Sequence, residues 1–318
     1  MIQVREHTCV IGVPAFNEER VIVRALESLW RQRDHPTYRF HLVVVANGCT
    51  DRTVDVALAF AQSRCGKVAS VVSGVEGSRW LFQADGRAVT VCNLPRPSKV
   101  AALQLIHDLG TDVVVVLDAD SWFEQDDAII GICRSLEQHP DAAAVAPRVV
   151  GDIVALQRSQ PLLNEHLRRL VCGAVNAFDL VTPRLDGRVY AYRLASITRR
   201  LPDLVAVDLW LEWTFWKEGG GCVYLPSPVV HYVFPKTWGQ LVRQYVRYKS
   251  SIADLEREYP AVMAEIACAR RPFIRPGGAR FWLHRAIGWL FFRWLARQAP
   301  STGVDGGGPW EVITSTKE

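Results

Sequence analysis

Two carboxylates separated by one residue, Asp118 and Asp120, directly follow the apolar segment 113–117. In extended backbone, side chains two positions apart point to the same side, so the pair would lie at the carboxyl edge of a parallel sheet. There the two acids can hold Mg²⁺ or Mn²⁺, and the cation can bridge a diphosphate. An isolated pair of this kind is more often two solvated acids in a turn. The buried strand before it, and the segments described next, favour the cation site.

Polar segments also follow the first two predicted strands. Segment 14–18 (Pro-Ala-Phe-Asn-Glu) comes after the first strand, and segment 47–51 (Asn-Gly-Cys-Thr-Asp) comes after the second. Both have a structural interpretation, in which a proline ends the strand, Asn17 caps a helix from Glu18 onward, and a polar turn starts the next helix. In the functional interpretation the same side chains line a nucleoside pocket, and Lys99, in the first turn of a later helix, supplies a cation there.

Short apolar runs alternate with helical patterns through the first third of the chain. We predict strands over 9–13, 40–45, 68–72 and 113–117, and helices over 18–33, 51–64 and 98–109. This alternation indicates right-handed crossovers and a mostly parallel sheet. Segment 74–97, which contains glycines and prolines, is expected to be a long connection with a small hairpin around Asp85-Gly86. Beyond it we predict helices over 126–138, 157–178, 204–218 and 237–258, and strands over 142–147, 189–193, 222–225 and 229–233.

The order of these motifs at one sheet edge closely resembles the family 2 glycosyltransferases with the GT-A fold. Downstream, 187–193 resembles the acceptor-side loop and strand of that family, and Val207-Asp208 stands where it carries a pair of acids. Segment 244–248 resembles the Gln-x-x-Arg-Trp motif of its membrane-associated members, so the resemblance covers residues 8–250. It implies an α/β GT-A fold, with a mostly parallel central sheet flanked by helices and a C-terminal helical extension. The implied divisions are a catalytic domain over 1–235 (nucleotide-binding half 1–120, acceptor half 121–235), a basic helical segment over 236–300 and a flexible tail over 301–318.

The resemblance also implies a role for each matching residue. The candidate contacts to a nucleoside-diphosphate sugar are Pro14, Phe16, Glu18, Asn47, Asp51, Lys99, Asp118, Gln244 and Arg247. Asp120 would ligate Mg²⁺ or Mn²⁺ on the diphosphate, with Asp118 and His231 as further candidate ligands. Asp208 would be the base that deprotonates an acceptor hydroxyl, which gives inversion at the anomeric carbon. Glu212 is the rival for that role, because positions i and i+4 share a helix face.

A few positions depart from the family pattern. Ala46 and Asn47 stand where the family usually has two acids, so a carboxylate that reads the base is missing. Gln104 replaces a common asparagine, and Val207 replaces the first acid of the pair that ends at Asp208. These departures leave the base of the donor open, and the sequence specifies neither the sugar nor the acceptor.

The positive charge of the chain is concentrated near its end. The net charge of +4 is too small for a general nucleic-acid binder. Residues 266–304, however, contain seven arginines and no acid, which leaves the rest of the chain at −3. Within that segment, 280–297 combines tryptophans with arginines, as in an amphipathic helix that lies on an anionic membrane surface next to a lipid-linked acceptor. The alternative is a helix packed on the catalytic domain with solvated arginines.

Cysteine usage and the start of the chain indicate the compartment. The eight cysteines show no spacing typical of a zinc site and are expected to be reduced, buried thiols. No signal peptide is recognised at the start, and the longest stretch free of charged residues, 219–235, contains three prolines and cannot be a membrane-spanning helix. We therefore expect a cytoplasmic protein, either free or peripheral on the cytoplasmic face of a membrane.

Other protein classes fit the sequence less well. A nucleotidyltransferase would need a glycine-rich, basic loop after the first strand, where this chain has segment 14–18. The fingerprints G-x-G-x-x-G and G-x-x-x-x-G-K-[ST] are absent, which argues against a nicotinamide oxidoreductase and a P-loop enzyme. From a different class, a non-catalytic sugar-nucleotide-binding protein of the same fold stays open because of Ala46 and Asn47.

Overall fold

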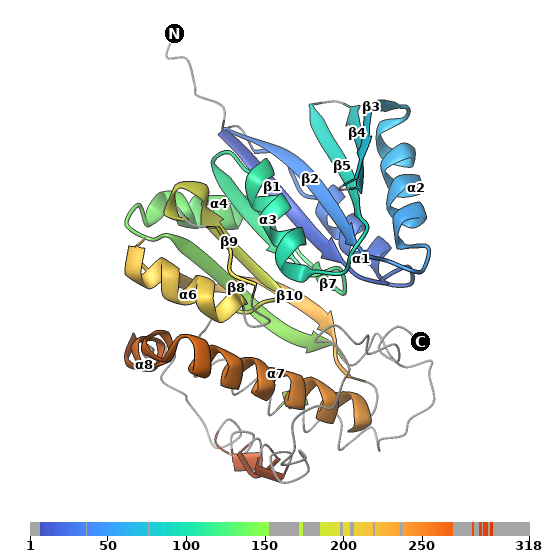
Figure 1. Cartoon of the computed structure of the whole chain (residues 1–318). Helices are drawn as coiled ribbons and strands as arrows, with labels where there is room; N and C mark the ends of the chain where they lie inside the picture. The colour runs from blue at the N-terminus through green and yellow to red at the C-terminus, as the bar shows by residue number, and fades with distance from the viewer. Residues whose placement is uncertain are drawn as a thin grey trace.

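A ten-stranded mixed sheet runs through the described part of the chain, in the order β3-β4-β5-β2-β1-β6-β9-β8-β10-β7 (Figure 1). The computed structural model describes residues 7–35, 37–75, 77–84, 86–152, 172–173, 185–197, 200–203, 207–218, 220–235, 238–269, 282, 286–287, 289–291 and 293–294. The strands are β1 (His7–Ala15), β2 (Tyr38–Asn47), β3 (Val68–Gly74), β4 (Gly77–Ala84), β5 (Arg87–Leu94), β6 (Val113–Leu117), β7 (Ser121–Phe123), β8 (Ala144–Asp152), β9 (Val189–Arg193) and β10 (Cys222–Val233).

The four central strands are parallel, as expected of a mostly parallel sheet, although one of them, β5, lies in the segment predicted to be a long connection. β5, β2, β1 and β6 lie side by side in the same direction. The four valines and one leucine of β6 are all buried, which suits a strand covered on both faces. Because parallel strands end at the same side, one edge of the sheet carries four strand ends: Ala15, Asn47, Leu94 and Leu117. The polar segments singled out in the sequence begin at these ends.

Antiparallel strands extend both flanks of this centre, and one of them corrects a prediction. Segment 74–97 contains the antiparallel strands β4 and β5 and is not a long connection. Its glycines lie at the strand ends, where Gly77 and Gly86 have φ angles of 122° and 77°. In β5, Val89, Thr90, Val91 and Cys92 are all buried, and Phe82 of β4 is buried beside Val89, so the burial of this segment outweighs its turn residues. β3 is likewise an antiparallel neighbour of β4 and not a fourth parallel strand.

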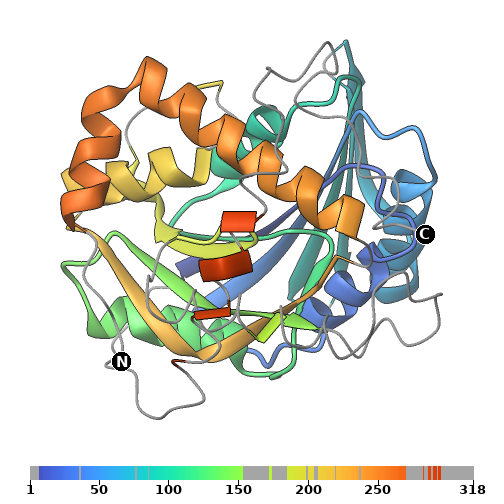
Figure 2. The same ribbon diagram turned by 90° about the horizontal axis from the view of Figure 1, so that it is seen from below.

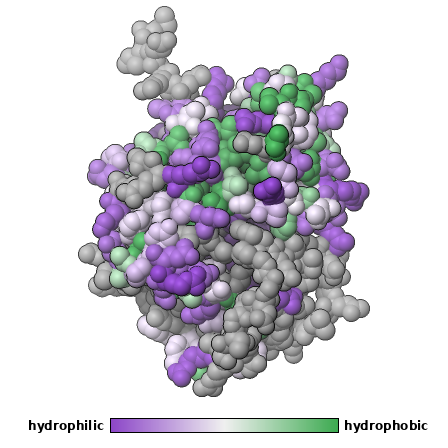
Figure 3. All heavy atoms as spheres, in the orientation of Figure 1, coloured by the Kyte–Doolittle hydropathy of each residue, from purple (hydrophilic) through white to green (hydrophobic). Residues whose placement is uncertain are grey.

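β3 forms an open edge of the sheet. All its residues are exposed, and Val71 and Val72 are 51% and 66% exposed. Figure 3 shows apolar side chains gathered at the surface over β3 to β5, at the upper right. Charged side chains usually protect the edge of a sheet from pairing with another chain. β3 contains no charged residue and lacks this protection.

Helices cover both faces of the sheet. They are α1 (Ile22–Trp30), α2 (Thr53–Cys65), α3 (Lys99–Leu109), α4 (Ala128–Gln138), α6 (Val207–Glu218), α7 (Trp238–Glu258) and α8 (Pro260–Ala269), with a short 3-10 turn at Leu194–Ser196. The apolar side chains of α1, α2 and α4 pack into the core on one face. Those of α3 and α6 pack into the core on the other face, and α7 and α8 lie outside α6 (Figures 1 and 2).

One strand of the structure replaces two predicted strands near the end of the sheet. The strands expected at 222–225 and 229–233 form one strand, β10, with a register shift between Leu225 and Val229. Prolines at 226 and 228 remove ladder donors there, which explains the interruption seen in the sequence. The helix expected over 157–178 and the tail over 301–318 lie outside the described residues, apart from residues 172 and 173.

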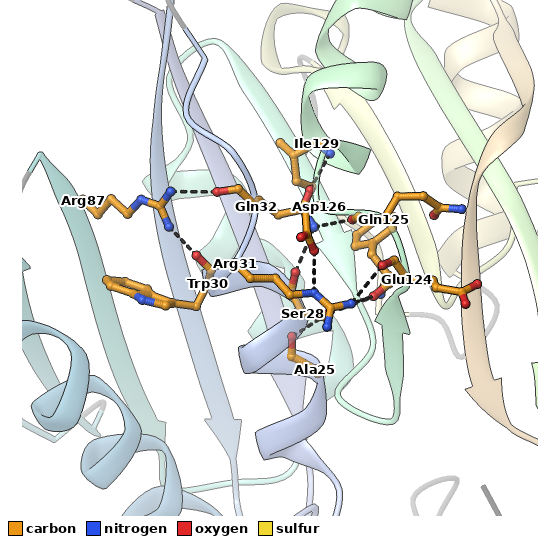
Figure 4. A network of polar contacts seen from close by, with 11 residues as sticks. Ala25, Ser28, Trp30, Arg31, Gln32, Arg87, Glu124, Gln125, Asp126 and Ile129 are labelled. Carbon is orange, nitrogen blue, oxygen red and sulfur yellow. Dashed lines mark hydrogen bonds and ion pairs between the residues drawn. The ribbon is translucent and has the colours of Figure 1, made fainter.

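A polar network holds β7, the strand that follows Asp120, against the end of α1 (Figure 4). The buried amide of Gln32 donates to the carbonyls of Ser28 and Gln125 at 2.9 and 2.8 Å and accepts from the N–H of Ile129 at 3.0 Å. The guanidinium of Arg31 donates to the carbonyl of Phe123 at 2.8 Å. Because the buried polar atoms are paired, the network fixes the position of the chain just after the candidate cation site.

Candidate active site

The side chain of Asn47 joins three loops at the carboxyl edge of the sheet. It is 4% exposed. Its amide nitrogen donates to the carbonyl of Ala15 at 2.9 Å, and its amide oxygen accepts from the N–H of Ser98 at 3.1 Å. Gly48, with φ 70°, packs so closely on Pro97 that no side chain would fit there. Asn47, predicted to contact the nucleotide sugar, therefore also positions the loops that follow β1, β2 and β5.

The loops after β1 and β2 are bonded directly to each other. The side-chain oxygen of Asn17 accepts from the N–H of Thr50 at 2.7 Å, and the N–H of Glu18 donates to the hydroxyl of Thr53 at 2.7 Å. Asp51 accepts from the N–H groups of Glu19 and Thr53, at 3.1 and 3.0 Å. Asn17 therefore does not cap the next helix as expected. It has φ 55°, and α1 begins only at Ile22.

These bonds make the two loops one preformed unit. Pro14 is buried within β1, while Phe16 and Glu18 are half-buried in the loop that follows it. The three candidate nucleotide contacts of the first motif thus stand on a backbone that the second motif holds in place.

Lys99 and Asp118 form an ion pair at the same edge. Ser98 caps α3 as predicted, since its hydroxyl accepts from the N–H of Ala101 at 3.1 Å. This places Lys99 in the first helical turn, with its ammonium 2.9 and 3.1 Å from the two oxygens of Asp118. The pKa of Asp118 is raised, because burial and the neighbouring Asp120 disfavour its charge more than Lys99 and Arg188 favour it. A cation and a partly buried carboxylate therefore meet where the strand ends.

The turn before β9 completes this cluster, and sequence reasoning did not assign its residues. The N–H of Asp118 donates to the carbonyl of Arg188 at 2.8 Å. Asp186 holds the guanidinium of Arg188 at 2.9 and 3.1 Å, and this guanidinium lies 3.9 Å from the ring centre of Tyr232. The motif 187–193 was noticed in the sequence, and Asp186 and Arg188 are only two residues apart, but their place beside Asp118 follows from β9 lying next to β6.

The structure separates the two candidates for the catalytic base. The carboxylate of Asp208 lies against Gly187, where a methyl group would be 3.1 Å from its Oδ2. Glu212, one turn later in α6, is only 3% exposed and lies close enough to Cys222 to help burial raise the pKa of that thiol. Cys222 opposes Ala144 at the far end of β10 from the ion pair. Asp208 thus faces the cluster and Glu212 faces the core.

The other candidate metal ligands lie next to β7: Asp120 directly precedes this strand, and His231 lies on the neighbouring strand β10. Asp120 accepts from the hydroxyl of Ser121 at 3.1 Å. His231 stacks on Trp122 with 5.9 Å between ring centres and lies 3.2 Å from a carboxylate oxygen of Glu124. Among the described residues, no three His, Cys, Asp or Glu side chains are close enough together to hold a metal ion by themselves.

Gln244 and Arg247 both lie in α7, which runs outside α6 (Figure 1). Gln244 is half-buried. The structure thus brings the first four motifs and Asp208 together, and it places the positions of Gln244 and Arg247 in a separate helix.

Comparison with known families identifies this arrangement. A model described as glycosyltransferase-like family 2 matches residues 7–249. The chain belongs to this family. It is a glycosyltransferase of family 2, and its fold is the GT-A fold that the motif order predicted.

Solved structures agree on the fold of this family 2 glycosyltransferase. The mannosyltransferase PcManGT from Pyrobaculum calidifontis, in complex with GDP-Man and Mn²⁺, aligns over 94% of this chain and 77% of its own, with TM-score 0.56 and 20% identity. A mycobacterial protein aligns over 79% and 74%, with TM-score 0.51 and 18% identity. S. aureus TarS 1–349 in complex with UDP-GlcNAc aligns over 72% and 59%, with TM-score 0.50 and 14% identity. No curated protein matches the chain.

Proposed function

We propose that this family 2 glycosyltransferase moves a sugar from a nucleoside-diphosphate sugar to an acceptor hydroxyl with inversion. The observation that carries the proposal is that Gly187 contacts both the Lys99–Asp118 pair and Asp208: its carbonyl accepts from the ammonium of Lys99, and its Cα faces the carboxylate of Asp208. A fixed cation suited to a diphosphate and a carboxylate suited to a hydroxyl proton therefore meet at one turn. Single displacement with inversion needs both groups, one for the leaving group and one for the nucleophile.

Each residue then has a defined task. The acceptor oxygen attacks the anomeric carbon, the bond from that carbon to the diphosphate breaks, and Asp208 takes the proton of the acceptor hydroxyl. The diphosphate leaves with the electron pair of the broken bond. Lys99 faces the increasing negative charge on the leaving group. Phe16 and Glu18, on their preformed loops, are proposed to hold the nucleoside.

The charges at the site fit a divalent cation. Four acids, Asp118, Asp120, Asp186 and Asp208, lie in or beside this cluster together with the cations Lys99 and Arg188. Carboxylate oxygens are the ligands that Mg²⁺ and Mn²⁺ prefer. Asp120, with Asp118, would hold the ion, and His231 is retained as a further candidate. When bound, the ion would neutralise charge on the departing diphosphate.

A thermal-shift screen of UDP, GDP, dTDP and CDP, each with and without Mn²⁺, tests the donor class. One diphosphate is expected to raise the unfolding midpoint, and to raise it further with Mn²⁺, because a ligand that binds only the folded state stabilises it. The two nucleotide sugars bound in the similar structures, GDP-Man and UDP-GlcNAc, differ in their base. The screen therefore also identifies the base that this enzyme prefers. The matching nucleoside monophosphate and Mn²⁺ alone are the controls. No shift with any diphosphate would contradict the proposal.

A second proposal concerns the C-terminal arm, residues 280–297, which we infer contacts an anionic membrane surface. Its side chains Trp282, Trp289, Leu290 and Trp294 are 55%, 57%, 60% and 43% exposed. The guanidinium of Arg293 lies 4.6 Å from the ring centre of Trp289, while Phe291 packs on the core of the domain. Exposed tryptophans beside arginines suit the headgroup region of a bilayer.

This arm would hold the enzyme at a lipid-linked acceptor. Figure 2, seen from below, shows its described segments facing outward beside α7. A membrane-crossing helix is absent from the described ranges, where none of the helices reaches the required length and apolarity. The described cysteines are free thiols, which suits a reducing compartment. We propose that the protein lies peripherally on the cytoplasmic face of a membrane.

Replacing Trp282, Trp289 and Trp294 together by alanine is expected to abolish co-sedimentation with liposomes that contain anionic lipid. The matched control is Trp216→Ala, since Trp216 is 46% exposed but lies in α6. Liposomes of neutral lipid alone should bind the wild-type protein weakly, because the arginines then lose their partner. If the triple variant and the wild type sediment equally, the arm is not the membrane contact.

A further inference from the structure

We propose that Gly187 is a positioning residue that sets the distance between the leaving-group cation and the catalytic base. Its carbonyl accepts from the ammonium of Lys99 at 3.4 Å, and its Cα faces the carboxylate of Asp208. One residue therefore touches both sides of the reaction. The inference rests on the proposed function, because it takes Asp208 as the base.

The approach of Asp208 leaves little room for a side chain at position 187. A methyl group there would lie 3.1 Å from Oδ2, 3.3 Å from Cγ and 3.4 Å from Cβ of Asp208, so the carboxylate would have to give way by a few tenths of an ångström. Gly187 does not have a positive φ angle, so alanine is not disfavoured there by a left-handed backbone. The constraint on this position that the structure shows is the approach of the Asp208 carboxylate.

Hydrogen bonds within the turn that carries Gly187, and one bond to the end of β6, hold this turn in place. The carboxylate of Asp186 accepts from the backbone N–H of Arg188 at 2.9 Å and binds its guanidinium. The carbonyl of Arg188 accepts from the N–H of Asp118 at 2.8 Å, and the N–H of Val189 donates back to the carbonyl of Asp186 at 3.0 Å. Because the turn is held in this way, a methyl group on Gly187 would displace Asp208 and not the turn.

Such a displacement should affect one step of the reaction. The three atoms nearest to the added methyl group all belong to Asp208, whereas the proposed donor contacts are Lys99 and the loops after β1 and β2. Proton transfer, in contrast, needs the base within hydrogen-bond reach of the acceptor hydroxyl. The expected signature is a lower kcat with unchanged donor affinity.

Gly187→Ala is expected to lower kcat about tenfold, because a misplacement of a few tenths of an ångström costs less than the ~100-fold typical of 1 Å. The dissociation constant of the donor, measured by calorimetry, should stay within about twofold of the wild type. Gly74→Ala is the matched control, since Gly74 has no positive φ and its added methyl group would meet no atom within 4 Å. A weaker donor affinity with unchanged kcat would overturn the proposal.

A double-mutant cycle on stability tests the contact independently of catalysis. Gly187→Ala should lower the thermal midpoint of the wild type but not that of Asp208→Ala, which lacks the crowded carboxylate. If the midpoint falls equally in both backgrounds, the methyl group acts elsewhere and the positioning role is wrong. If the cycle succeeds but the wild type binds no nucleoside diphosphate, the contact is real and the proposed function fails.

Discussion

Replacing Asp208 with asparagine is expected to lower kcat by about 10²–10⁴-fold, the range typical of losing a positioned general base. Asparagine keeps the size of the side chain and can occupy the same place beside Gly187, but it cannot accept the proton of the acceptor hydroxyl. Donor affinity should not change, because the proposed donor contacts are Lys99 and the loops after β1 and β2, while Asp208 is proposed to contact the acceptor hydroxyl. Steady-state kinetics together with calorimetry of donor binding would separate the two effects.

Glu212→Gln is the variant that discriminates between the two acids of α6. Glu212 is buried near Cys222, so its replacement should alter the free energy of unfolding more than kcat. The assignment of the base would be reversed if Glu212→Gln lost the larger part of kcat while remaining folded and Asp208→Asn stayed active.

Asp120→Asn is expected to remove the Mn²⁺-dependent part of the stabilisation by a nucleoside diphosphate. Asparagine can still accept from the hydroxyl of Ser121, so the chain after β6 should keep its position. A neutral amide is a much weaker ligand for a hard cation than a carboxylate. We also expect kcat to fall by about 10²–10³-fold, which corresponds to several kcal/mol of lost charge stabilisation in the transition state.

The thermal midpoint with the preferred diphosphate, titrated with Mn²⁺, provides the readout for this variant. Asp55→Asn is its control, because Asp55 is an exposed acid in the first turn of α2. A full Mn²⁺ response in Asp120→Asn would show that other residues hold the cation.

The centre of the fold could be predicted because burial dictates it. The predicted bounds of β6 and β9, 113–117 and 189–193, agree with the structure, since each is a short apolar run between polar residues. The turn of the β4–β5 hairpin around Asp85-Gly86 was predicted, but the length of its strands was not, because the glycines and prolines of the segment indicated a long connection. Local turn residues say where a chain bends, but they do not say how much of the intervening segment pairs.

The sequence predicted most residues of the candidate site, but not the contacts between them. Side chains at the ends of parallel strands must share an edge, so the Asp pair, Lys99 and the first two motifs could be placed together from the sequence. The place of the Asp186–Arg188 pair beside Asp118 could not, because it depends on β9 lying antiparallel to β6. The hydrogen bonds of Asn17 were also missed, since a capping residue and a loop-bridging residue look alike in a sequence.

The amide of Asn47 has a consequence for how donor preference can diverge. The side chain of Asn47 is hydrogen-bonded both to the end of β1 and to the start of α3. A change in the conformation of one of these loops would therefore disturb the others. Changes of nucleobase or sugar preference among descendants of this enzyme are therefore expected at side chains that stand on the scaffold, such as Phe16 and Glu18. Attempts to redesign its choice of donor should leave position 47 untouched.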